Sequence, residues 1–154
     1  RPSRRRLMAD ERYFLDVNIP MYAAGAEHPL KAPCIAVLQK AVDGEIELLI
    51  DAEIIQEVLH RYGSVQRWRL AEEVSQTLLT LASRVLPVGE AEMVQTLALF
   101  KQYAPLGIRA RDLLHVAVMQ ANELTQIIST DSHFDSITGI TRLSPTAFTN
   151  TFAK

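Results

Sequence analysis

Residues 110–131 of the 154-residue chain read ARDLLHVAVMQANELTQIISTD, and their pattern indicates the fold class. Residues 110–123 carry apolar side chains almost all round the helical period, which is typical of a helix that is buried on every side. Residues 126–129 form a short apolar run between polar residues, which is typical of a buried strand. A buried helix that leads into a buried strand is the repeating unit of a parallel sheet covered on both faces.

The same alternation extends outward along the chain. We predict strands over 12–15, 46–50, 85–88, 126–129 and 140–143, and helices over 18–25, 31–42, 52–62, 65–83, 90–103, 110–123 and 145–151. Ser64 is expected to cap the helix over 65–83, because its hydroxyl accepts a backbone N–H at a helix start. The sequence therefore predicts one α/β domain, with a central, mostly parallel sheet of about five strands and helices on both faces.

Charge is unevenly distributed along the chain. The 16 basic and 18 acidic side chains give a net charge of −2, which argues against binding nucleic acid through bulk positive charge. Four of the basic residues are arginines among the first six positions, so residues 7–154 hold 12 bases against 18 acids, a net of −6. We interpret residues 1–8 as a basic N-terminal extension or a tag remnant, and residues 9–154 as the domain.

The rest of the composition excludes several classes of protein. Hydrophobic residues make up 48% of the chain, which is enough for a packed core and argues against global disorder. Cys34 is the single cysteine, so an intramolecular disulfide is excluded and a buried thiol is expected. No apolar run approaches the ~20 residues that cross a membrane, and no secretory signal pattern is seen. We therefore expect a cytoplasmic protein with no membrane partner.

Two of the predicted strands are each followed by an aspartate. Asp16 comes directly after residues 12–15, and Asp131 follows residues 126–129. Active sites of open parallel sheets lie at the carboxyl ends of the strands, so we expect these two carboxylates at one edge of the sheet. Capping of the element that follows is the alternative role for each of them.

Two further acids stand near the starts of helices. Glu57 lies close to the strand that precedes its helix, and Asp112 lies in the first turn of the apolar helix, where the helix dipole also favours an acid. If Asp16, Glu57, Asp112 and Asp131 share one pocket, they raise each other's pKa values. A hard divalent cation such as Mg²⁺ or Mn²⁺ relieves that repulsion. Asp135, four residues past Asp131, is a further candidate ligand or a turn residue.

These residues, in this order, resemble the PIN-domain family. The stretch Phe14-Leu15-Asp16-Val17-Asn18 is similar to the family's opening Asp-x-Asn motif, and Glu57 matches the lone glutamate of its second motif. Residues 111–117 look like the third acidic motif, and residues 129–137 look like the C-terminal signature. The resemblance covers essentially residues 12–145 and is closest to small bacterial VapC-type toxins.

The resemblance implies a function and a set of site residues. It implies a Mg²⁺- or Mn²⁺-dependent endoribonuclease that hydrolyses RNA phosphodiester bonds, the toxin of a toxin–antitoxin pair, held inactive by a cognate antitoxin and homodimeric. It also implies an acidic metal-binding set formed by Asp16, Glu57, Asp112 and Asp131, with Asp135 as an auxiliary acid and with Asn18 and Thr130 as polar residues beside the metal.

Contact with RNA has to come from local rather than net charge. Arg109 and Arg111 flank Asp112 and are the predicted RNA contacts; a solvated helix face or salt bridges to an antitoxin are the alternative. The amphipathic helices over 31–42 and 65–83 offer a groove for an antitoxin helix.

Three other interpretations start from the same residues. A phosphotransfer domain or phosphatase of a doubly wound fold has an Asp after its first strand but needs a late Lys, and none of the lysines follows a late core strand. Glu57-x-x-His60 and Asp112-x-x-His115 have the carboxylate–His spacing of helical di-iron bundles, although His115 is expected to be a hydrogen-bonded core residue. A catalytically inert PIN-like protein-binding module is the third, and the intact acidic set argues against it.

Overall fold

The computed structural model describes residues 11–152, so the predicted extension over residues 1–8 lies outside the described residues. The described chain contains a five-stranded sheet in the order β3-β2-β1-β4-β5, in which each neighbouring pair is parallel. The predicted α/β class and parallel sheet are thus confirmed. The strands are β1 (Arg12–Leu15), β2 (Glu47–Asp51), β3 (Arg84–Leu86), β4 (Gln126–Ile128) and β5 (Thr141–Leu143).

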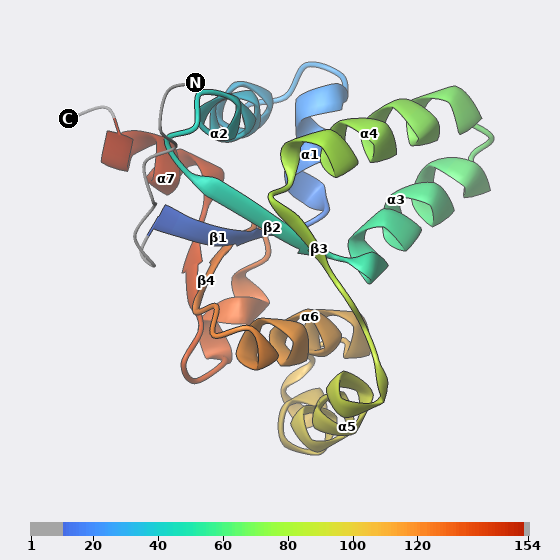
Figure 1. The fold of residues 1–154 in the computed structure, drawn as a ribbon, viewed down its shortest axis with the longest axis vertical. Coiled ribbons are helices and arrows are strands. Elements are labelled where there is room, and N and C mark those ends of the chain that lie inside the picture. Colours follow the sequence, from blue (N-terminus) through green and yellow to red (C-terminus); the bar gives the residue numbers. More distant parts are fainter. Residues whose placement is uncertain (1–10, 153–154) are drawn as a thin grey trace, which may run out of the picture.

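Helices cover both faces of this sheet, as predicted. Figure 1 shows α2 and α4 on one side of the sheet and α5 and α6 on the other. None of the helices in the described range is long and apolar enough to cross a membrane. The helices are α1 (Asn18–Ala24), α2 (Lys31–Val42), α3 (Ala52–Ser64), α4 (Trp68–Leu81), α5 (Glu90–Tyr103), α6 (Ala110–Ala121) and α7 (Pro145–Phe152), with 3₁₀ turns η2 (Ala104–Leu106) and η3 (Ser132–Ser136).

The core is mostly aliphatic, contains the buried rings of Phe14, Phe134 and Phe148, and is centred on the inner strands and α6. Phe14, Ile50 and Ile127 are fully buried, and every residue over 113–119 of α6 is buried. Full burial of an aliphatic or Phe side chain contributes about 1.5–3 kcal/mol to folding, so α6 is one of the most firmly held elements. Cys34 is buried, as predicted, and burial raises the pKa of its thiol to about 11.

The junction between α3 and α4 differs from the prediction. Ser64 does not cap α4: it is the last residue of α3, and its hydroxyl donates a hydrogen bond to the Arg61 carbonyl at 2.9 Å. The chain then turns through Gln66, whose φ is +60°, and α4 begins at Trp68. The helix continues through Gly63, since one isolated Gly costs a helix only ~1 kcal/mol and α3 packs against α4. The other boundaries agree with the prediction within one or two residues.

The order of the strands fixes where a site can form. The chain builds β2 and β3 on one side of β1, and then β4 and β5 on the other side. The backbone N–H of Asp16 donates to the carbonyl of Ile128 at 3.1 Å, which ties the carboxyl end of β1 to that of β4. This is the topological switch point, where open parallel sheets bind their ligands.

Candidate active site

A pocket of about 230 Å³ opens at this switch point, and acidic and basic side chains line it. The four acids predicted to share a site all contribute to its wall, from the residue after β1, from α3, from α6 and from the loop after β4. The lining residues are Asp16, Val17, Asn18, Glu57, Arg61, Arg109, Arg111, Asp112, Asp131 and His133.

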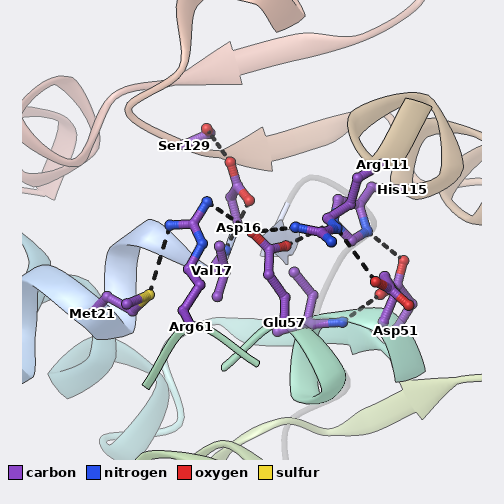
Figure 2. Close-up of polar contacts among 11 residues, drawn as sticks. Asp16, Val17, Met21, Asp51, Glu57, Arg61, Arg111, His115 and Ser129 are labelled. Atoms are coloured by element: carbon purple, nitrogen blue, oxygen red, sulfur yellow. Dashed lines mark hydrogen bonds and ion pairs between the residues drawn. The ribbon is translucent and has the colours of Figure 1, made fainter. Parts of the chain in front are cut away.

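Asp16 is held rigidly at the floor of the pocket. Its side chain is buried; Oδ1 accepts a hydrogen bond from the Val17 N–H at 2.8 Å, and Oδ2 accepts one from the Ser129 hydroxyl at 2.6 Å (Figure 2). Burial raises the pKa of the Asp16 carboxyl. The capping alternative is not seen, because the start of α1 has no side-chain cap. Asp16 is therefore an oriented carboxylate that faces the pocket.

Asp131 combines the two roles that the sequence left open. It lines the pocket, and its Oδ1 also accepts a hydrogen bond from the His133 N–H at 2.9 Å, which caps the η3 turn. The same oxygen lies 2.8 Å from Nδ1 of His133. The Asp131 backbone N–H donates to the Ser129 hydroxyl at 3.0 Å, so Ser129 connects the Asp16 carboxylate to the backbone of Asp131.

Asp135, predicted as an auxiliary ligand, does not line the pocket. Its carboxylate forms a bidentate pair with the Arg142 guanidinium, with both N–O distances at 2.9 Å, and this pairing lowers the pKa of the Asp135 carboxyl. Arg142 also donates to the Ser129 carbonyl at 3.1 Å. Asp135 thus braces η3 against β5 and β4, behind the loop that carries Asp131.

Glu57 is buried and surrounded by cations. Its Oε2 lies 2.9 Å from Nη2 of Arg61 and 3.6 Å from Nη1 of Arg111, while its Oε1 lies 3.8 Å from Nε2 of His115 (Figure 2). Burial by itself would raise the pKa of Glu57, but His115 and the two arginines outweigh it and lower the pKa. Glu57 is therefore ionised at neutral pH.

Asp112 experiences the repulsion expected of a shared acidic pocket. It lies in the first turn of α6. Burial, together with the nearby charges of Asp16 and Asp131, raises the pKa of its carboxyl to about 6. At neutral pH the folded protein holds this carboxylate ionised at a cost in stability, which a bound cation would relieve.

Behind the pocket lies a charged pair that the sequence did not single out. His115 is fully buried on α6, as expected of a core histidine, and its Nδ1 lies 2.6 Å from Oδ2 of Asp51. Asp51, also fully buried, accepts a second hydrogen bond from the Ile54 N–H at 3.0 Å and so caps α3. Burial would lower the pKa of His115, but Asp51 and Glu57 outweigh it and raise the pKa to about 10. The imidazole is therefore a buried cation between two carboxylates.

The predicted polar residues divide into those at the pocket and one outside it. Asn18 lines the pocket, and its Oδ1 is buried without a hydrogen-bond partner in the described structure. Arg109 and Arg111 stand at the exposed rim. Thr130 is not among the lining residues; its neighbour Ser129 makes the contacts to Asp16 and Asp131 instead.

Three further residues contribute to the site, and the sequence carries a structural signal for two of them. Asp51 directly ends a buried strand, as Asp16 nearly does, so the same edge argument applies to it. Arg61 stands four residues after Glu57, a spacing at which side chains meet on a helix. Ser129 carried no such signal, because its role depends on how β4 aligns with β1.

The donor set suits a hard divalent cation. The candidate ligands are all oxygens, their charges repel one another, and the unpartnered Oδ1 of Asn18 adds a neutral oxygen. Within residues 11–152 no three His, Cys, Asp or Glu side chains stand close enough together to hold a metal ion as they lie. Glu57 is directed to Arg61 instead. The donors therefore fit Mg²⁺ or Mn²⁺ in chemistry, and their side chains would have to close around the ion.

Comparison of the sequence with known proteins identifies the family of the chain. The family model described as "PIN domain" matches residues 13–140. The chain is 36% identical over 130 residues to VapC ribonuclease Mb1869c of Mycobacterium bovis, which covers 84% of this chain and 98% of the relative. The same values hold for ribonuclease VapC13 of Mycobacterium tuberculosis.

Solved structures of similar fold agree with the sequence match. VapBC2 from Rickettsia felis, bound to a promoter DNA fragment, superposes with a TM-score of 0.68 at 16% identity, over 86% of this chain and 98% of that chain. VapC20 of Mycobacterium tuberculosis, described as a sarcin–ricin loop cleaving toxin, superposes with a TM-score of 0.67 at 14% identity, over 80% and 93%. Since the family model and the VapC ribonucleases both match most of its length, the chain belongs to the PIN-domain family, among its VapC-type members.

Proposed function

We propose that the protein is a Mg²⁺- or Mn²⁺-dependent endoribonuclease, and that it acts in the cytoplasm as the toxin of a toxin–antitoxin pair. The observation that carries this proposal is the convergence of Asp16, Glu57, Asp112 and Asp131 on one pocket at the carboxyl edge of the sheet. The relatives named as VapC ribonucleases support it.

The four carboxylates would hold the divalent cation, with Asn18 as a further oxygen donor. When bound, such a cation lowers the pKa of water and stabilises negative charge on the departing oxygen of a phosphodiester. Asp16 contributes a fixed carboxylate, because its two oxygens are oriented by the Val17 N–H and the Ser129 hydroxyl. Such an oriented group does not need to reorganise during the reaction.

The arginines at the pocket supply the positive charge that the chain lacks on average. Arg109 and Arg111 are exposed at the rim, next to Asp112. Guanidinium groups bind phosphate through paired N–H donors, so these two side chains are proposed to contact phosphates of the RNA backbone. An RNA substrate therefore meets local positive charge despite the overall negative charge.

The proposed antitoxin would dock on the face formed by α1, α2 and α4. These helices enclose a mostly apolar hollow of about 390 Å³, lined by Ile35, Leu38, Leu70 and Val74 among others. An amphipathic helix binds to such a groove through its apolar face. The R. felis match is described as a VapBC assembly, which supports a protein partner. We further propose a homodimer, and exposed Leu97 and Phe100 on α5 offer apolar surface for it.

RNA cleavage under defined metal conditions tests the proposal. Labelled structured RNA should be cleaved with Mg²⁺ or Mn²⁺, spared with EDTA, and spared by Asp16→Asn and Asp112→Asn, which remove a ligand charge and preserve shape. Asp43→Asn, at the exposed end of α2, is the matched control and should cleave normally. Cleavage that survives EDTA or both pocket variants would show that these carboxylates are not the active site.

A further inference from the structure

The carboxylate of Glu57 already has cationic neighbours on both oxygens. Arg61 and Arg111 meet the same oxygen, Oε2, and His115 faces Oε1 (Figure 2). The Glu57 side chain is only 4% exposed, so little water remains to screen these charges. A metal ion that takes Oε2 would stand beside two guanidinium groups, and like charges that close repel one another strongly in a partly buried site.

The two arginines differ in whether they keep a carboxylate partner when Glu57 turns away from them. Nε of Arg111 lies 3.3 Å from Oε1 of Glu53, so Arg111 keeps a carboxylate partner if Glu57 turns away. In the structure as described, Arg61 has no carboxylate partner other than Glu57, and its second contact is a 3.8 Å approach to the sulfur of Met21. Arg61 is therefore the cation that loses its partner when Glu57 turns toward a metal.

A guanidinium released in this way stands at the entrance to the pocket. Arg61 extends from α3 one turn after Glu57, lines the pocket, and leaves 41% of its side chain exposed. The anion that then comes within reach is the phosphate backbone of an RNA bound in the pocket, and guanidinium is well matched to phosphate.

We propose that Arg61 is an exchangeable counter-cation of this site: it pairs with Glu57 in the metal-free protein and transfers to an RNA phosphate when a divalent cation takes Glu57. The inference rests on the proposed function, because it needs both the metal and the RNA. It makes two demands: Arg61 competes with the metal for Glu57, and it adds a phosphate contact only after the metal is bound.

The first demand is tested by Mn²⁺ binding without RNA, measured by titration calorimetry. Arg61→Gln should bind Mn²⁺ about fivefold more tightly than the wild type, since the loss of a partly exposed ion pair is worth about that factor. Arg61→Lys keeps the charge and should stay near the wild type. Arg69→Gln is the matched control, because Arg69 also pairs with a glutamate four residues away, Glu73, but on the surface of α4.

The second demand is tested by the salt dependence of RNA cleavage with saturating Mn²⁺. One lost phosphate contact should reduce the slope of log(kcat/KM) against log[KCl] by about 0.7 for single-stranded RNA. Arg61→Gln should show that reduction with a raised KM, whereas Arg61→Lys and Arg69→Gln should keep the wild-type slope. Melting temperatures of all variants in EDTA establish that each is folded.

The outcomes separate this inference from the proposed function. If the wild type binds no Mn²⁺ and cleaves no RNA, the proposed function fails. If the wild type does both, then unchanged or weaker Mn²⁺ binding by Arg61→Gln overturns the competition, and an unchanged salt slope overturns the transfer to phosphate. Tighter Mn²⁺ binding together with the smaller slope supports the exchange.

Discussion

The imidazole of His115 lies between two carboxylates: its Nδ1 is 2.6 Å from Oδ2 of Asp51, and its Nε2 is 3.8 Å from Oε1 of Glu57. Asp51 on one side and Glu57 on the other would repel each other in a buried space without it. Loss of one member of a buried ionic group leaves the others uncompensated and typically costs about 3–5 kcal/mol. His115 is therefore a structural residue of the site, which explains a histidine on an otherwise apolar helix.

We expect His115→Gln to lower the free energy of unfolding by about 3 kcal/mol at pH 6. The pKa of His115 is raised to about 10 in the folded protein from an ordinary value near 6.5. Its stabilising contribution is therefore complete below the unfolded value and disappears as pH rises toward 10. Urea unfolding at pH 6, 8 and 10 should show the gap between wild type and variant closing.

The exposed His60 provides the control for that experiment. His60→Gln should follow the wild type at every pH, because its side chain contributes no buried charge. A gap for His115→Gln that stays constant from pH 6 to pH 10 would mean that His115 is neutral in the folded protein.

Asp112→Asn should stabilise the metal-free protein while it abolishes cleavage. Because the pKa of Asp112 is raised to about 6, the folded state disfavours its ionised form, and the penalty is present above pH 6 and absent below about pH 4. In EDTA at pH 8 we expect a gain of about 1–2 kcal/mol after allowance for solvent screening, and about a third of that gain at pH 4.5. Thermal unfolding at both pH values measures this, and a destabilised variant at pH 8 would contradict the electrostatic account.

The sequence identified the acids of the pocket because they follow strands or begin helices, where the fold class sets their position. It did not indicate that Asp135 and Thr130 lie outside the lining of the pocket, since their positions depend on side-chain direction within a short loop. Asp135 turns to Arg142 on β5, and Ser129 rather than Thr130 faces Asp16. Periodicity indicates which element carries a residue but does not indicate the direction in which a loop side chain points.

The loop after β4 is held in place by contacts to β5. The Arg142 guanidinium on β5 links Asp135 of η3 to the Ser129 carbonyl at the end of β4. A bidentate pair fixes geometry better than a single contact does. The brace therefore positions the segment that carries Asp131 without entering the pocket.

We expect Arg142→Gln to loosen this segment with little global effect. The Asp135 end of the pair is half-exposed, so its contribution to stability lies in the range of about 0–1 kcal/mol. Hydrogen exchange should accelerate over residues 129–138, and cleavage should slow. Glu45→Gln, which removes the exposed Lys40–Glu45 pair, should leave exchange there unchanged. Equal exchange in the two variants would show that Arg142 does not brace the loop.

The elements themselves could be read from the sequence with one clear error. The helices over 31–42 and 90–103 end where predicted, because apolar periodicity and Gly or Pro breaks coincide there. The Ser64 cap was wrong because two helices meet in a hairpin, and the packing of α3 against α4 decides where each ends. Such junctions depend on tertiary contacts that no local pattern contains.

For the molecule as a whole, the positions of the acidic residues matter more than their excess over basic residues. A net charge of −6 over residues 7–154 argues against an RNA partner only if the acids are dispersed over the surface. Instead, four of them line one pocket together with Arg61, Arg109 and Arg111. A site that concentrates repelling carboxylates lowers the stability of the metal-free fold, and a ligand that binds only the folded state restores it.

If the four pocket carboxylates form one divalent-cation site, the melting temperature of the protein depends on Mn²⁺. Mn²⁺ at about 100 times its Kd stabilises a one-site protein by about 2.7 kcal/mol. The wild type and Asp43→Asn should therefore melt several degrees higher with Mn²⁺ than with EDTA, and Asp16→Asn and Asp112→Asn should lose most of that rise. Equal rises in all four proteins, or no rise in the wild type, would contradict a metal site at this pocket.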